Sequence, residues 1–363
     1  TEDLQWGAGM GYRWRMQRIP VGVVGASGYS GIELLRILLG HPGVELAAVT
    51  SRQYAGAAVS SVFPRFRGDP VADALAFSAP EADALAALPV AFWFLALPHG
   101  VAATFALPLL AAGRRVIDLS ADFRLRDAAV YREFYDHDHP APALLAEAVY
   151  GLPEARADAI RGARLVASPG CYPTSVLMPL LPVLRAGLVD PASIVVASMS
   201  GVSGAGRKES LAMLFCECNE SVRAYSVPRH RHLSEIEQEL SLAAGVPVRV
   251  TFLPHLVPIT AGICTTITAT ALPGCDAAAL GGALQAAYGG AAFVRLLGAN
   301  GCPDTRQVVG TNFIDIGWAF DPRTGRAILL SAEDNLGKGA ASQAVQSFNL
   351  MAGLDESCGL RRF

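Results

Sequence analysis

The chain has 363 residues, of which 52% are hydrophobic and 17% are charged, and its formal net charge is −3 at neutral pH. That proportion of apolar residues excludes a largely disordered chain. The slightly acidic balance argues against nucleic acid or an anionic membrane surface as the main partner. At roughly 150 residues per domain, the length predicts two domains.

Three features of the sequence bear on where the protein is found. Residues 1–19 lack the apolar stretch of a secretory leader, and we expect them to form an N-terminal extension. Seven cysteines, an odd number spread along the chain, indicate reduced thiols and a cytoplasmic protein. Residues 84–113 contain no charged side chain and could span a bilayer. Three prolines interrupt them, so we interpret them as a buried strand followed by a helix, with no membrane partner.

From residue 21 onward, short apolar strands alternate with helical segments. Strands are predicted over residues 21–25, 44–50, 92–97, 115–119 and 164–168, and a helix over residues 32–39. Apolar strands separated by helices are typical of a parallel sheet covered on both faces. We therefore predict a doubly wound, Rossmann-type α/β domain over residues 20–170.

The second half of the chain changes in character. Strands with alternating or β-branched residues are predicted over residues 248–252, 263–270, 313–318 and 326–330. Such strands suit an antiparallel or mixed sheet with helices on one face. We predict an α+β domain over residues 171–335 for substrate binding, catalysis and oligomerisation. A C-terminal helix within residues 336–363 is expected to complete the first domain.

The loop between the first strand and the first helix carries glycines at positions 25, 28 and 31. Glycines allow a tight turn and the close approach of a pyrophosphate to a helix N-terminus, so we predict a dinucleotide site. An NAD-binding domain usually has an acidic residue about 20 residues further on. Here the second strand ends in Thr50, Ser51 and Arg52, and these favour the 2′-phosphate of NADP. Arg52 could also be an ordinary solvated loop charge.

Cys171 follows a Pro-Gly turn and precedes an apolar helical run that is predicted to begin near Thr174. A thiol at a helix N-terminus is exposed to the positive end of the helix dipole, which favours the thiolate. Cys171 is therefore our candidate nucleophile, although most cysteines are inert core residues.

His230 and His232 lie where a loop meets a predicted helix, and either could exchange protons as an acid and base. A zinc site formed with Cys216 and Cys218 is an alternative. The C-x-C and H-x-H spacings are shorter than those of the usual zinc sites, however, and we predict no metal.

A second loop rich in Gly and Ser covers residues 200–208 and ends in Arg207 and Lys208. Its backbone N–H groups and Arg207 would suit a phosphate or another anionic group. The same composition is also typical of a flexible connector.

Motifs spread over residues 20–363 resemble, in order, those of the N-acetyl-γ-glutamyl-phosphate reductase family. They occupy residues 25–31, 97–100, 118–124, 150–154, 169–174, 200–207, 215–220, 230–232, 254–258, 310–313 and 334–339.

The resemblance implies a two-domain reductase related to aspartate-semialdehyde and glyceraldehyde-phosphate dehydrogenases. It would use NADPH to reduce N-acetyl-γ-glutamyl phosphate to the semialdehyde, in arginine biosynthesis, through a thioester on Cys171. Either His230 or His232 would be the acid and base, with a slight preference for His232. The family also suggests a homotetramer, with a homodimer as the other expectation.

The resemblance also assigns binding residues. The cofactor residues it implies, together with those from the loops above, are Gly25, Ser27, Gly28, Tyr29, Ser30, Ser51, Arg52, Pro98, Gly170 and Asn335. Of these, the residues at 27–30 would hold the pyrophosphate, Asn335 would approach the nicotinamide amide, and Pro98 would lie on the adenosine side. Ser203 and Arg207 would bind the substrate.

Three other functions stay open at this point. One is a sister reductase of lysine biosynthesis that acts on a carrier-protein-bound aminoadipyl phosphate. Another is a non-catalytic protein that senses NADP. The third, a Cys-His hydrolase, is disfavoured because hydrolysis needs no dinucleotide loop.

Overall fold

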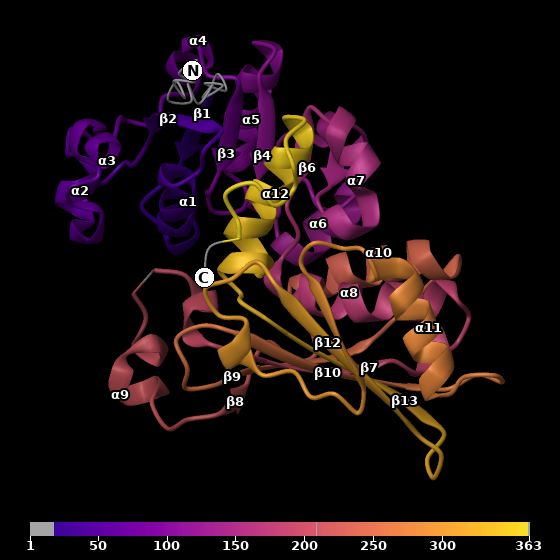
Figure 1. The fold of residues 1–363 in the computed structure, drawn as a ribbon. Coiled ribbons are helices and arrows are strands. Elements are labelled where there is room, and N and C mark those ends of the chain that lie inside the picture. The colour runs from indigo at the N-terminus through magenta and orange to yellow at the C-terminus, as the bar shows by residue number, and fades with distance from the viewer. Residues whose placement is uncertain (1–17, 208, 362–363) are drawn as a thin grey trace, which may run out of the picture.

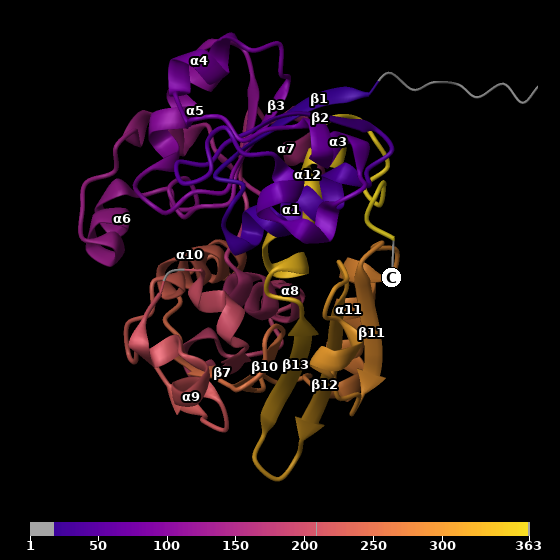
Figure 2. The ribbon, with the colours of Figure 1, turned by 90° about the vertical axis from the view of Figure 1, so that its left-hand side faces the viewer.

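The computed structural model describes residues 18–207 and 209–361. It contains two β-sheets, which follow one another along the chain and lie one above the other (Figures 1 and 2). Most of the expected N-terminal extension, residues 1–17, lies outside the described residues, as does Lys208. Ile19, which we had placed in that extension, is already part of the first strand.

The first sheet has six parallel strands in the order β2-β1-β3-β4-β6-β5. These strands are β1 (Ile19–Val24), β2 (Val44–Val49), β3 (Phe92–Leu95), β4 (Arg115–Asp118), β5 (Val149–Tyr150) and β6 (Leu165–Ala167). Phe92 and Phe94 of β3 point into one hydrophobic core, and Trp93 and Leu95 point into another. Both faces are therefore buried, which is why these strands lack polar alternation. The Rossmann-type prediction is confirmed.

Helices cover both faces of this sheet. The helices of this part of the chain are α1 (Tyr29–Leu39), α2 (Val59–Val62), α3 (Pro70–Ala74), α4 (Ala82–Ala87), α5 (Ala102–Ala111), α6 (Ala128–Tyr135) and α7 (Pro153–Gly162). Helix α1 packs on one face, and α4 and α5 pack on the other. The uncharged run over residues 84–113 forms the end of α4, then β3 and α5. In the described part of the chain, no helix has the length and hydrophobicity needed to cross a membrane.

The second sheet has seven strands in the order β11-β12-β13-β10-β7-β9-β8. They are β7 (Val195–Ser200), β8 (Arg223–Ala224), β9 (Thr251–Leu256), β10 (Ile263–Thr270), β11 (Val294–Ala299), β12 (Ile314–Asp321) and β13 (Arg326–Glu333). Strand β10 runs antiparallel to β7 and β13, whereas β7 and β9 are parallel, so the sheet is mixed as predicted. Strands β7, β8 and β11 were not predicted.

Helices lie on one face of the second sheet only (Figure 1). They are α8 (Cys171–Arg185), α10 (His232–Ala244) and α11 (Ala277–Tyr288); the short α9 (Phe215–Cys218) lies in a loop segment. Along β10, Ile263, Thr265, Ile267 and Ala269 are buried, and the residues between them are partly or fully exposed. This alternation shows that one face of the sheet packs on the helices, while the other is not covered within the described chain.

The C-terminal segment returns to the first sheet (Figure 2). After β13 the chain forms the short helical turn η7 (Gly337–Ala341) and then α12 (Ser342–Met351). The Phe348 ring packs edge-on against Phe92, with 5.0 Å between ring centroids. Lys338 is fully buried, and its Nζ donates to Glu154 Oε1 (2.6 Å) and to Gln346 Oε1 (2.7 Å). These contacts fix the C-terminal helix against α7.

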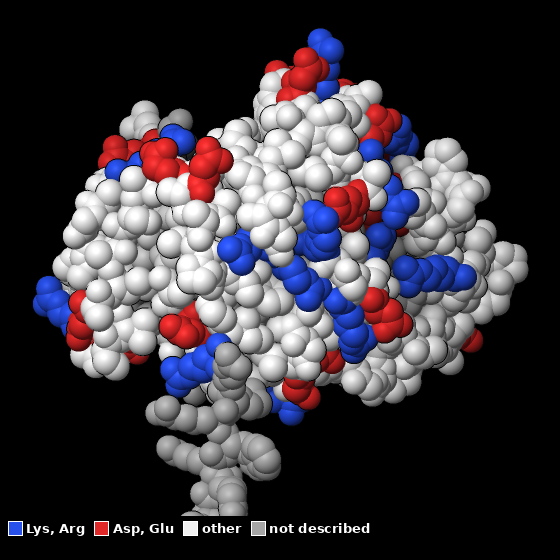
Figure 3. Space-filling model, turned by 90° about the horizontal axis from the view of Figure 1, so that it is seen from above, with Lys and Arg blue, Asp and Glu red and all other residues white. Residues whose placement is uncertain are grey.

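Charged side chains are sparse on the surface. Seen from above, basic and acidic side chains lie close to one another on a largely uncharged surface (Figure 3). This mixture agrees with the low charged fraction of 17%.

The buried Lys338–Glu154 pair yields a prediction about stability. Lys338→Met removes the cation but keeps most of the volume, and it leaves the Glu154 carboxyl buried without its charged partner. We expect a loss of about 3–5 kcal/mol in the free energy of unfolding, measured by urea denaturation. The control is Arg161→Ala, which breaks the exposed pair with Asp158 (2.7 Å) and should cost less than about 1 kcal/mol. Equal losses in the two variants would contradict this assignment.

Candidate active site

Two cavities meet at Cys171. The first has a volume of about 550 Å³ and follows the carboxyl ends of the strands of the first sheet. The second has a volume of about 920 Å³ and lies toward the second sheet. The residues that line both cavities are Leu97, Pro98, Arg124, Cys171, Gly204, Gly206, Arg207 and His232. In parallel α/β sheets, ligands bind beyond the carboxyl ends of the strands, where the strand order reverses, as it does here between β1 and β3.

The glycine loop between β1 and α1 forms one wall of the first cavity. Gly25 has φ +82°, and a Cβ there would lie 2.5 Å from the carbonyl oxygen of Ala96. A Cβ on Gly31 would lie 2.6 Å from backbone atoms of Ala26. Gly28 is different: it caps α1 without a side-chain hydrogen bond, and a Cβ there would meet nothing within 4 Å. The N-terminus of α1 is thus open to the cavity, as a phosphate-binding helix start requires.

The end of the second strand lies beside this loop. Ser51 Oγ is 3.0 Å from Ser27 Oγ, and Arg52 is exposed at the edge of the cavity. The hydroxyl of Thr50 instead accepts a hydrogen bond from Gly25 N (3.1 Å) and holds the glycine loop in place. We expected the hydroxyls of both Thr50 and Ser51 to bind a phosphate. For Thr50 this expectation is wrong, because its hydroxyl is engaged by the loop. Among the described residues that line the first cavity there is no Asp or Glu.

Cys171 is the first residue of α8, and Gly170 is its N-cap. The helix thus begins three residues earlier than the prediction near Thr174. The expected acidity of the thiol is wrong for this structure. Burial and then the carboxyl of Glu333 raise the pKa of Cys171 to about 12, with a smaller contribution from Glu235, and the N–H of Tyr172 and the charge of Arg124 only partly oppose them. Loss of hydration outweighs the helix dipole.

His232, the first residue of α10, lies next to the turn that carries Cys171. A Cβ on Gly170 would be only 2.6 Å from His232 Nε2, so glycine is needed for this approach. Burial and then the neighbouring His230 and Arg124 lower the pKa of His232 well below its ordinary value. The ring is therefore neutral, and its buried Nδ1 has no hydrogen-bond partner among the described residues.

His230 has a different setting. It lines only the second cavity, and its ring packs edge-on against Tyr172 (5.4 Å), Tyr225 (5.5 Å) and Phe252 (5.6 Å). Its Nδ1 accepts a hydrogen bond from the backbone N–H of His232 (3.1 Å). His232 thus lines both cavities together with Cys171, whereas His230 lines the second cavity and is hydrogen-bonded to the backbone of His232.

Sequence reasoning missed two charged residues that hold this arrangement, Arg124 and Glu235. Glu235 is 1% exposed, and its Oε1 accepts hydrogen bonds from Gly170 N (2.9 Å) and Tyr150 Oη (2.6 Å). Arg124 donates to Glu235 Oε2 (3.3 Å) and to the carbonyl oxygen of Ser168 (2.8 Å). Both lie in or beside recognised motifs, but only burial distinguishes them from other charged residues.

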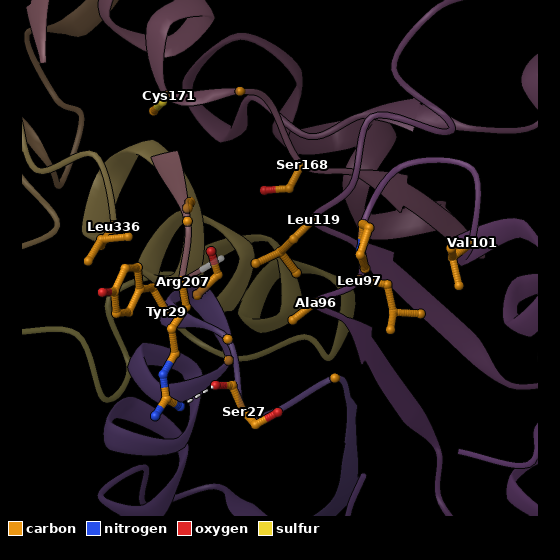
Figure 4. A pocket seen from close by; sticks show the side chains of 18 of the residues that line it. Ser27, Tyr29, Ala96, Leu97, Val101, Leu119, Ser168, Cys171, Arg207 and Leu336 are labelled. Atoms are coloured by element: carbon orange, nitrogen blue, oxygen red, sulfur yellow. Dashed lines mark hydrogen bonds between the residues drawn. The ribbon is translucent and has the colours of Figure 1, made fainter. Parts of the chain in front are cut away.

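The Gly- and Ser-rich loop reaches the first cavity from the second sheet. Asn335 donates to Ser203 Oγ (2.9 Å) and accepts from Gly262 N (2.7 Å), so part of its amide is used to hold this loop. Arg207 extends to the dinucleotide loop and donates to the carbonyl oxygen of Ser27 (2.9 Å) (Figure 4). Ser203 lines the first cavity and Arg207 lines both, although both were expected at the substrate.

Other predicted residues are also placed by the structure. Tyr29, Ser30 and Gly170 line the first cavity. Pro98 lines both cavities, so it is not confined to the adenosine side. His99, the next residue in the chain, lines the second cavity, and its Nε2 lies 2.9 Å from Arg231 Nη1.

The zinc interpretation is not supported by the geometry. Cys216 and Cys218 lie in α9 and line neither cavity. Over residues 18–207 and 209–361, no three His, Cys, Asp or Glu side chains are grouped so that they could hold a metal ion.

Comparison with known proteins identifies the class to which this architecture belongs. Residues 20–163 match the family described as "Semialdehyde dehydrogenase, NAD binding domain", and residues 171–335 match "Semialdehyde dehydrogenase, dimerisation domain". Aspartate semialdehyde dehydrogenase II from Vibrio cholerae has a similar fold, with a TM-score of 0.69 and 19% identity over 93% of this chain and 99% of that one. The Candida albicans enzyme gives a TM-score of 0.63 at 15% identity, over 92% and 99%.

Closer sequence relatives define the family. An N-acetyl-gamma-glutamyl-phosphate reductase from Akkermansia muciniphila is 60% identical, covering 95% of this chain and 99% of its own. One from Pseudomonas putida is 50% identical, covering 94% and 98%. The chain belongs to the N-acetyl-γ-glutamyl-phosphate reductase family of oxidoreductases.

The close approach of His232 to Gly170 yields a second prediction. In Gly170→Ala the new methyl group would lie 2.6 Å from His232 Nε2 and 2.9 Å from Arg124 Nη1. Since these side chains are held by hydrogen bonds and packing, we expect the free energy of unfolding to fall by about 1–3 kcal/mol. Urea denaturation measures the change. Gly162→Ala, where a Cβ would meet nothing within 4 Å, is the control and should not destabilise the protein. A Gly170→Ala variant as stable as this control would contradict the prediction, because it would show that His232 and Arg124 can move away from the new methyl group.

Proposed function

We propose that this protein uses NADPH to reduce N-acetyl-L-γ-glutamyl phosphate to N-acetyl-L-glutamate 5-semialdehyde and phosphate, in arginine biosynthesis. Membership of the reductase family supports the substrate and the direction. One observation carries the proposal for this chain: Cys171 lies where a dinucleotide-type cavity meets a second cavity rich in arginine.

The second cavity suits an anionic substrate. Five arginines line it, and no Asp or Glu does so within the described residues; the arginines are Arg124, Arg207, Arg223, Arg229 and Arg231. The proposed substrate carries a carboxylate and an acyl phosphate, both of which arginine binds with paired hydrogen bonds. The position of Arg207 at both cavities suits it to contact either the substrate phosphate or the cofactor.

The first cavity fits NADP(H). Gly28 leaves the start of α1 open, so the backbone at residues 27–30 would hold the pyrophosphate. Ser51 and Arg52 would hold the 2′-phosphate, in a wall without carboxylates. Gly25, Pro98, Gly170 and Asn335 would complete the site. NADPH supplies the hydride that reduces the thioester.

Cys171 and His232 would divide the remaining chemistry. The thiol gives its proton to the neutral His232, and the sulfur attacks the acyl carbon of the substrate. A carbon–sulfur bond forms, the bond from carbon to the phosphate oxygen breaks, and phosphate leaves. After reduction, the carbon–sulfur bond breaks, the aldehyde leaves, and His232 returns the proton to sulfur. Glu235 acts as a positioning residue by holding Gly170.

We also propose separate functions for the two parts of the chain. NADP would be held by residues 20–170 and by the C-terminal segment 336–363. Residues 362 and 363 of that segment lie outside the described part. Residues 171–335 would supply the nucleophile and the assembly surface. The exposed face of the second sheet, where Met199 is 48% exposed, supports a homodimer or homotetramer. Seven cysteines without disulfides support a cytoplasmic location.

Turnover in the reverse direction tests the substrate. With N-acetylglutamate semialdehyde, phosphate and NADP⁺, we expect NADPH to appear, measured by its absorbance, only when phosphate is present. Phosphate is required because it must displace the acyl group from sulfur. Absence of turnover, with turnover of a carrier-bound aminoadipate semialdehyde instead, would favour the sister reductase.

Cys171→Ser serves as the control for that assay. It should abolish NADPH formation while NADP⁺ binding, followed by calorimetry, stays within about threefold, or roughly 0.7 kcal/mol, of the wild type. Retained turnover would exclude a thioester on this residue. A wild-type protein that binds NADP⁺ but turns over neither substrate would indicate the sensor.

The pKa of His232 predicts the acid side of the pH profile. Because burial lowers this pKa, the ring stays able to accept a proton below about pH 6.5, where an ordinary histidine becomes charged. We expect kcat/KM to stay level as pH is lowered to about that value and to decline only below it. His232→Asn should lower kcat by about 10²–10⁴-fold. A larger loss in His230→Asn would reverse the assignment of the two histidines.

A further inference from the structure

Besides Glu235, a second acidic side chain, Glu333, lies near Cys171, and the mechanism above does not use it. Glu333 is the last residue of β13 and is fully buried. Within the described chain, neither of its carboxyl oxygens has a hydrogen-bond partner. A buried carboxylate without partners is strongly disfavoured, whereas the protonated acid is tolerated. The environment therefore favours a neutral Glu333.

The position of Glu333 relative to Cys171 follows from the packing around Gly339 in η7. The point that a Cβ on Gly339 would occupy lies 2.8 Å from Cys171 Cβ and 2.9 Å from Glu333 Oε1. The carboxyl group and the cysteine thus both lie within 3 Å of the same point at Gly339, so they are close neighbours.

The charged groups around Glu333 are already engaged. Lys338, the cation whose charge acts on it, binds Glu154 and Gln346. Asp334 accepts hydrogen bonds from the backbone N–H groups of Gly310 (2.7 Å) and Leu336 (2.9 Å). Asp334 and Glu154 are both acidic and add to the cost of a charge on Glu333. No described cation is left to pair with it.

We propose that Glu333 is a positioning residue that controls how much negative charge Cys171 can carry, and that a thiolate forms there only while the neighbouring carboxyl keeps its proton. This inference rests on the proposed role of Cys171 as the nucleophile. Two negative charges on neighbouring side chains, one of which is fully buried, repel each other, so the two groups titrate as a coupled pair. Glu333 thereby limits ionisation of the thiol at alkaline pH, where the carboxyl has lost its own proton.

The direction of both pKa shifts agrees with this coupling. Burial raises the pKa of Glu333 well above its ordinary range, and the charge of Lys338 opposes it. Burial and then Glu333 raise the pKa of Cys171, and Arg124 opposes them. The thiol of Cys171 is thus harder to ionise because of Glu333, whereas burial and the acidic Asp334 and Glu154 make Glu333 harder to ionise.

Glu333→Gln tests the coupling because it keeps the shape of a neutral acid and cannot ionise. The full-length enzyme is treated with iodoacetamide without substrate or cofactor across a range of pH, and Cys171→Ser identifies the signal of the other thiols. At neutral pH, where Glu333 is protonated, the alkylation rate should equal that of the wild type. At alkaline pH it should exceed the wild-type rate, by up to about tenfold if the thiol pKa falls by one unit.

Two results would overturn the proposal. Superimposable profiles would show that the two groups do not interact, and a slower rate at every pH would show a packing role only. Asp315→Asn is the matched control, since this carboxyl on the neighbouring strand β12 binds Arg295 (2.5 Å) instead. It should follow the wild-type profile.

A second measurement covers the case in which the variant does not fold. In the wild-type enzyme, infrared spectroscopy at neutral pH should show the C=O stretch of a buried protonated carboxyl, and this band should disappear at alkaline pH. Absence of the band at neutral pH would overturn the proposal. Neither measurement needs substrate turnover, so a wrong substrate assignment would leave both results intact.

Discussion

The geometry of the site depends on one buried carboxyl group, that of Glu235. It receives hydrogen bonds from Gly170 N, Tyr150 Oη and Arg124, and so fixes the backbone immediately before the nucleophile. Glu235 belongs to α10 over the second sheet, whereas Arg124 and Tyr150 come from the first half of the chain. One fully buried group therefore joins the two halves of the molecule at Cys171, and loss of any partner would leave a costly unpaired polar group.

Burial also sets the chemical state of the reacting groups. The start of α8 would favour a thiolate at Cys171, but loss of hydration and the nearby Glu333 act in the opposite direction. The same loss of hydration keeps His232 uncharged. In the proposed mechanism, a neutral thiol and a neutral imidazole would form the resting pair, and one proton transfer would create the nucleophile.

Local patterns predicted much of the fold. The strand over residues 263–270 has the bounds of β10, because its alternation reflects one buried and one open face. The glycine loop and the Rossmann-type strands were found from apolar runs and turn residues. Strand β11 was missed because its residues are only partly buried and its parallel pairing with β12 depends on a distant segment. The start of α8 was missed because Tyr172 and Pro173 are read locally as a turn.

The sequence by itself determined the family, the dinucleotide loop and the candidate nucleophile, since these are encoded in short runs of neighbouring residues. Only the tertiary structure shows how the surroundings of His232 and His230 differ, because both share one motif and differ only in what packs against them. It also revealed Arg124 and Glu235 as a buried ion pair beside Cys171, and Glu333 as a buried carboxyl group without a hydrogen-bond partner among the described residues. Burial and pairing arise from contacts between segments far apart in the chain, so no local pattern could have shown which carboxyl groups would be buried with a partner and which without one.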